Sequence, residues 1–114
     1  MHELGIAAAA LQQTLEQAAS AGASRVARIV LRVGVFSGVD PEALRFAFAA
    51  ILPGTAAEGA VVEIDPVAAV AHCAGCQRDF SPDADRLFEC PVCGRIGAAI
   101  TQGRELELTR LEVY

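Results

Sequence analysis

The sequence predicts an α+β fold in which two helices pack on a small three-stranded mixed sheet, with a cysteine-bearing module inserted after the second strand. Three observations predict it. Apolar residues recur at helical spacing from Leu4, β-branched segments at residues 26–36 and 61–67 flank a second helical segment, and two Cys-x-x-Cys pairs precede a last strand-like segment. At 114 residues, the chain has the length of one domain with little surplus.

The first helix is predicted from an apolar stripe with glutamine and glutamate on the opposite side. Gly22 follows as a C-terminal cap, and residues 1–3 are expected to form a short lead-in. The stripe consists of Leu4, Ala8, Leu11, Leu15 and Ala18.

The first strand is predicted over residues 26–36. Ala27, Ile29, Leu31, Val33 and Val35 alternate with polar positions and form its apolar face. Three arginines, at positions 25, 28 and 32, form a stripe that we interpret as the solvated face of this strand rather than as a binding surface.

The second helix has a clear start and a clear end. Asp40 is placed as its N-cap, Pro41 as its first residue, and Pro53 with Gly54 stops it. The strand predicted at residues 61–67 follows, so the order strand, helix, strand suggests a crossover.

The last strand changes its alternation part-way. Leu106 and Leu108 share one phase, whereas Leu111 and Val113 fall on the other. A β-bulge near residues 109–110 would bring both pairs to the same face.

The four cysteines are the strongest chemical signal in the chain. Cys73 and Cys76 form one Cys-x-x-Cys pair, Cys90 and Cys93 form another, and Gly94 follows the second pair. Each pair presents two thiols across a tight turn, and two such turns complete a tetrahedral zinc site. The sequence therefore predicts a zinc-ribbon-like module.

Other uses of these cysteines are weaker interpretations. Two disulfides would need an oxidising compartment, whereas the start of the chain does not resemble a secretory signal, so we expect a cytoplasmic protein. Thioredoxin-like chemistry needs a single pair and leaves the second unexplained. Four cysteines could also hold an iron–sulfur cluster, which the spacing does not exclude. His72, next to Cys73, could replace a thiol at zinc, but we favour an exposed histidine at a strand end.

Composition argues against two classes of partner. The net charge is −5 and the basic residues are scattered arginines, which disfavours nucleic-acid binding. The apolar runs are too short to span a bilayer, so no membrane association is expected. No nucleophile–base pair or acid–base pair is apparent, so we do not expect an enzyme.

The N-terminus offers a second set of metal donors. The Met1 α-amine, the His2 amide and the His2 imidazole Nδ1 can close successive chelate rings on one ion, and the Glu3 amide adds a nitrogen. In-plane nitrogen donors suit Ni(II) or Cu(II). The competing interpretation is that His2 is a solvated terminal residue and that Glu3 only complements the helix dipole.

The whole chain resembles the HypA/HybF family of nickel-insertion accessory proteins for NiFe-hydrogenase. The resemblance rests on the start MHEL, the segments GVFSGVDPEALRFAF (34–48) and GTAAEGAVVEI (54–64), the paired Cys-x-x-Cys motifs, and the ending GRELELTRLEV (103–113).

The resemblance implies a nickel metallochaperone with a structural zinc site. Nickel would be cargo, bound by His2 with the Met1 amine, Glu3 and, as a further candidate, Asp40; zinc would be held by the four cysteines. Residues 1–69 with 104–114 would form the nickel-binding domain and 70–103 the inserted zinc-binding domain. The implied partners are a HypB-type GTPase and the NiFe-hydrogenase large subunit, with urease as another recipient, and the chain would be a monomer or weak homodimer.

Two other functions compete with nickel delivery. A zinc-ribbon adaptor would bind another protein without a second metal, so its N-terminus would be dispensable. A small redox protein would oxidise and reduce its Cys-x-x-Cys thiols reversibly.

Overall fold

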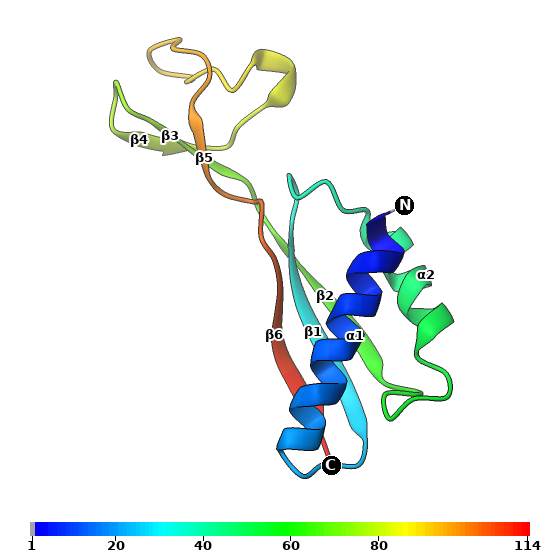
Figure 1. Ribbon diagram of the computed structural model, residues 1–114. Coiled ribbons are helices and arrows are strands. Elements are labelled where there is room, and N and C mark those ends of the chain that lie inside the picture. The colour runs from blue at the N-terminus through cyan, green and yellow to red at the C-terminus, as the bar shows by residue number, and fades with distance from the viewer. Residues whose placement is uncertain (1) are drawn as a thin grey trace.

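The computed structural model describes residues 2–114, and two sheets are built from this chain (Figure 1). The first sheet has the order β2-β1-β6, with β1 (Val26–Gly34) in the centre. It pairs in parallel with β2 (Val61–Val67) and antiparallel with β6 (Leu106–Val113). The predicted three-stranded mixed sheet is thus confirmed, and α2 (Pro41–Ile51) lies on the β1–β2 crossover.

Both helices cover the same face of this sheet (Figure 1), because the apolar side chains of β1 alternate toward them. Ile29, Leu31 and Val33 are almost completely buried on that face and share one core with Leu44 and Phe48 of α2. Val35, predicted on the same face, is instead exposed, because β1 ends at Gly34 and the chain turns there.

The first helix, α1 (His2–Ser20), differs from the prediction in start and phase. It begins at His2, so the predicted lead-in is wrong for His2 and Glu3, while Met1 lies outside the described residues. Because residues 7–10 are all alanine, the sequence does not show which side of this helix is buried. Leu4 and Ala8, which belong to the predicted apolar stripe, are exposed. The residues that α1 buries are Ala7, Leu11, Thr14 and Ala18.

Two local predictions are confirmed in detail. The carboxylate of Asp40 accepts a hydrogen bond from the Glu42 amide at 2.9 Å, as an N-cap does, and Pro41 is the first residue of α2. In β6, Arg110 pairs with Val30 and Leu108 pairs with Leu31, so Thr109 is the extra residue of a bulge.

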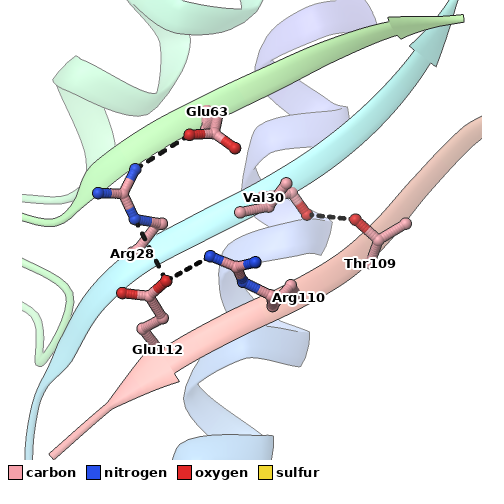
Figure 2. Close-up of polar contacts among 6 residues, drawn as sticks. All are labelled: Arg28, Val30, Glu63, Thr109, Arg110 and Glu112. Carbon is pink, nitrogen blue, oxygen red and sulfur yellow. Dashed lines mark hydrogen bonds and ion pairs between the residues drawn. The ribbon is translucent and has the colours of Figure 1, made fainter.

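The opposite face of the sheet carries charged side chains (Figure 2). Arg28 lies between Glu63 of β2 and Glu112 of β6, with nitrogen–oxygen distances of 3.0 and 3.4 Å, and Glu112 also contacts Arg110. These groups are partly exposed, so each pair contributes at most about 1 kcal/mol. The predicted solvated face of β1 is therefore confirmed for the partly exposed Arg28 and for the exposed Arg32, which pairs with Glu107. Arg25, the third arginine of the predicted stripe, lies before β1 and donates to the Glu58 carbonyl instead.

The second sheet lies between β2 and β6 in the sequence. It has the order β4-β3-β5, formed antiparallel by β3 (Val70–Cys73), β4 (Arg78–Phe80) and β5 (Ala99–Gln102), with a 3-10 turn at Ala84–Arg86. Figure 1 shows it extending away from the helices. The radius of gyration is 17.7 Å, whereas a compact chain of this length would have about 13 Å.

The two sheets meet where the chain passes from β2 to β3 and returns from β5 to β6. The Gly34 amide donates to the Glu105 carbonyl and the Phe36 amide to the Gly103 carbonyl, both at 2.7 Å. A Cβ at Gly34 would overlap that Gly103 carbonyl, so only glycine fits there. No described helix is long and apolar enough to cross a membrane.

Candidate metal centres

The four cysteines converge in the second sheet and the turns beside it. Their sulfur atoms all lie within 4.8 Å of one another, with 3.6 Å between the sulfurs of Cys73 and Cys93 and 4.0 Å between those of Cys76 and Cys90. A tetrahedron with zinc–sulfur distances of about 2.3 Å has its sulfurs about 3.8 Å apart. The arrangement therefore fits zinc.

The two cysteine turns have the same backbone form. The Gln77 amide donates to the Cys73 carbonyl at 2.8 Å, and the Gly94 amide donates to the Cys90 carbonyl at 2.9 Å. Both donor residues have positive φ, 56° at Gln77 and 76° at Gly94. Glycine adopts this conformation without strain, which explains Gly94; at Gln77 the turn imposes it on a residue with a side chain.

The electrostatics of the thiols also favour a bound cation. Backbone amides of Cys93 and Val92 donate to the Cys90 sulfur and lower the pKa of that thiol to about 7. The Cys93 thiol, together with burial, raises the pKa of Cys76 to about 12. Without a metal ion, four thiolates in this space would repel one another, and a divalent cation removes that penalty.

His72 does not join the cysteine cluster. Its Nδ1 lies 2.8 Å from an oxygen of Asp79 and its Nε2 lies 3.4 Å from the amide oxygen of Gln77. The contact with Asp79 raises the pKa of His72 above its ordinary value. Among the described residues, the cysteines form the one group of three or more converging metal-binding side chains, and His72 is not among them.

At the other site, the first turn of α1 lies against the loop before α2. The Nε2 atom of His2 is 3.1 Å from the Gly38 carbonyl oxygen. A carbonyl only accepts hydrogen bonds, so Nε2 donates and, in the neutral ring, Nδ1 keeps its lone pair. This is the nitrogen that a chelate with the neighbouring amide requires.

The backbone at this end of α1 is also available. A helix leaves its first amides without intrahelical acceptors, and α1 begins at His2. The His2 and Glu3 amides can therefore lose their protons to solvent and bind a metal through nitrogen without breaking a helical hydrogen bond. The Met1 amine lies outside the described residues.

Glu3 and Asp40 are neighbours through the backbone. A carboxylate oxygen of Glu3 accepts a hydrogen bond from the Asp40 amide at 3.2 Å and lies 3.4 Å from Nε2 of His2. The Asp40 amide is the main reason that the pKa of Glu3 is lowered. The Asp40 carboxylate is occupied as the cap of α2. The contact of His2 with Gly38 could not be predicted from the sequence, because every residue carries a backbone carbonyl and none of them marks this position.

Comparisons with known proteins agree on one family. A family model described as hydrogenase/urease nickel incorporation metallochaperone HypA matches residues 1–113. The chain is 42% identical over 112 residues to a hydrogenase maturation factor HypA of Chloroflexus aurantiacus, covering 98% of each chain. It is 40% identical over 113 residues to one of Picosynechococcus, covering 99% of each.

Solved structures agree with the sequence relatives. The solution structure of the Ni metallochaperone HypA from Helicobacter pylori superimposes with a TM-score of 0.69 at 26% identity, covering 99% of this chain and 97% of that one. A second solution structure, of a HypA protein, gives 0.75 at 26% identity, covering 100% and 97%.

Proposed function

The chain belongs to the HypA family of nickel metallochaperones for hydrogenase maturation, and from this membership we propose that it carries nickel at the N-terminus of α1. Nickel is its cargo, and the four-cysteine cluster is suited to structural zinc. The observation that supports the proposed nickel position best is the contact between His2 and the Gly38 carbonyl, which leaves Nδ1 of the ring free to bind.

The proposed ligands are nitrogen atoms close together in the sequence. The imidazole Nδ1 of His2 binds together with the backbone nitrogens of His2 and Glu3 and the amine of Met1. Such a set favours Ni(II) over zinc. Ni(II) accepts nitrogen donors in a square plane, whereas zinc prefers a tetrahedral arrangement.

The carboxylates of Glu3 and Asp40 are the remaining proposed ligands. Both already have a partner, since Glu3 accepts from the Asp40 amide and Asp40 accepts from the Glu42 amide. Each carboxylate has a second oxygen and further lone pairs, so these hydrogen bonds do not prevent metal binding. Direct coordination would place both groups on one ion between the starts of the two helices.

We also propose that zinc is bound by Cys73, Cys76, Cys90 and Cys93 and that the chain divides accordingly. Residues 1–69 with 104–114 form the nickel-binding domain, and residues 70–103 form the zinc-binding domain. The elongated shape and the separate hydrogen bonding of the two sheets support this division.

A maturation factor must work with other components of the maturation machinery. The partners that we propose are a HypB-type GTPase and the NiFe-hydrogenase large subunit, in the cytoplasm, with urease as another recipient. The chain would act as a carrier rather than as an enzyme, either as a monomer or as a weak homodimer. This role needs a site that holds nickel yet releases it, which suits partly exposed donors such as His2.

Nickel titration of His2→Ala tests the proposed position. We expect the affinity for Ni(II) to fall at least tenfold, because the imidazole donor is lost, and zinc content to stay at one per chain. An N-terminal extension that removes the free amine should have a similar effect. The matched control is His72→Ala, which removes the other histidine of the chain and should leave nickel binding unchanged. Unchanged nickel affinity in both N-terminal variants would contradict the proposal and favour an adaptor function.

A further inference from the structure

A pair of phenylalanines joins the zinc-binding segment to the loop beside the nickel residues. The rings of Phe36 and Phe88 meet edge to face, with centroids 5.8 Å apart and an interplanar angle of 67°. Phe36 follows β1 and is two residues from Gly38, whereas Phe88 is two residues from the zinc ligand Cys90. Both are half-buried, and their contact adds a side-chain link to the backbone hydrogen bond between the Phe36 amide and the Gly103 carbonyl.

Phe88 is held in an unusual backbone conformation. Both Leu87 and Phe88 have φ of 56°, a region that bulky L residues rarely adopt. Hydrogen bonds on both sides keep them there: the Phe88 amide donates to the Asp83 carbonyl at 3.0 Å, and the Gly97 amide donates to the Leu87 carbonyl at 2.8 Å. Strain of this kind persists only where the surroundings impose it, and it often marks a functional position.

The same segment is tied to the cysteine cluster. The Cys90 amide donates to the Arg95 carbonyl at 2.8 Å, and Cys90 itself is buried. The segment that carries Phe88 offers little apolar core of its own, because Leu87 and Ile96 are exposed. Its conformation therefore depends on the metal that the cysteines hold.

On the other side, Phe36 belongs to the loop that contacts the start of α1. Its amide donates to the Gly103 carbonyl, and the loop continues to Gly38, whose carbonyl accepts from His2, and to Asp40, whose amide donates to Glu3. A shift of Phe36 would move these two backbone groups relative to His2 and Glu3.

Building on the proposed nickel position, we propose that Phe88 is a positioning residue for nickel binding: by packing on Phe36, it holds the 36–40 loop against the start of α1 when the cysteines hold zinc. Zinc occupancy then raises the affinity of the chain for nickel. By linkage, nickel raises the affinity for zinc by the same factor.

The test compares nickel affinity in zinc-loaded and zinc-free protein. In the zinc-loaded state, Phe88→Ala should weaken Ni(II) binding about 3- to 10-fold, the range expected for losing one aromatic pair. Removing zinc from the unaltered chain should weaken Ni(II) binding by a similar factor. Removing zinc from Phe88→Ala should weaken Ni(II) binding little further. Phe88→Tyr keeps the ring and should restore the affinity.

Two further variants separate positioning from damage to the zinc site. Phe36→Ala lies outside the zinc-binding segment and should match Phe88→Ala, with the double variant no weaker than either. Leu87→Ala is the matched control, because Leu87 shares the φ of Phe88 but is 64% exposed, and it should bind nickel normally. Zinc content measured in each variant should stay at one per chain.

A readout without nickel distinguishes failure of this proposal from failure of the proposed nickel position. Adding zinc to the metal-free chain should shift the amide NMR signals of Gly38 and Asp40, and Phe88→Ala should abolish those shifts. Wild-type nickel affinity in both zinc-loaded phenylalanine variants, or loop signals that zinc leaves unchanged, would overturn the positioning role. Retained nickel binding in His2→Ala would instead overturn the nickel position alone.

Discussion

Replacing Cys90 with serine is expected to release zinc and unfold residues 70–103 while the β2-β1-β6 sheet and its helices stay folded. Beyond residue 69, the buried apolar side chains are Ala71, Cys73 and Cys90, so two of the three are proposed zinc ligands. A structural zinc site contributes about 10–16 kcal/mol of binding free energy in small modules. No other interaction in this segment approaches that figure.

Zinc stoichiometry and amide NMR together measure the effect of Cys90→Ser. Zinc should fall from about one per chain to near zero, and dispersed signals should survive for β1, β2 and β6 but collapse for β3, β4 and β5. Val92→Ser is the control, because it makes a polar change at an exposed position of the same turn and should keep zinc. Full zinc content in Cys90→Ser would refute the assignment of this cysteine.

Replacing Gly34 with alanine is expected to destabilise the junction between the two sheets by about 3 kcal/mol or more. The added Cβ would overlap the Gly103 carbonyl and lie 2.7 Å from the Arg104 amide nitrogen, and both are backbone atoms that cannot rotate away. Gly103 cannot yield easily, because its own Cβ position lies 2.7 Å from the Cα of Ala69. The strands that connect the sheets would have to separate.

Urea unfolding of the zinc-loaded protein measures this loss. The control is Gly5→Ala, the same chemical change at an α1 position with nothing within 4 Å, where alanine should stabilise the helix by about 0.5–1 kcal/mol. If Gly34→Ala unfolded at the same urea concentration as the unaltered chain, the close approach of the two strands would be contradicted.

Much of the fold could be predicted because its signals are local. The cap at Asp40, the bounds of β2 and the bulge at Thr109 each follow from a few neighbouring residues, and the structure confirms all three. The phase of α1 could not be predicted, because four successive alanines fit several faces equally and only packing selects one.

The candidate sites divide in the same way. The cysteine cluster follows from spacing, since each Cys-x-x-Cys turn brings its own two sulfurs together. The contact of His2 with the Gly38 carbonyl and the packing of Phe36 on Phe88 join residues far apart in the chain. Neither a backbone carbonyl nor a phenylalanine has a sequence pattern that specifies such a partner, so only the tertiary structure reveals them.

X-ray absorption at the nickel and zinc edges of one doubly loaded sample tests most directly the claim that the two metals occupy separate sites. Nickel should show nitrogen and oxygen neighbours and no sulfur, and zinc should show four sulfurs, as the ligands proposed for each site require. The nickel spectrum should change in His2→Ala while the zinc spectrum stays the same. Sulfur neighbours around nickel, or a nickel spectrum unaffected by loss of His2, would contradict the account.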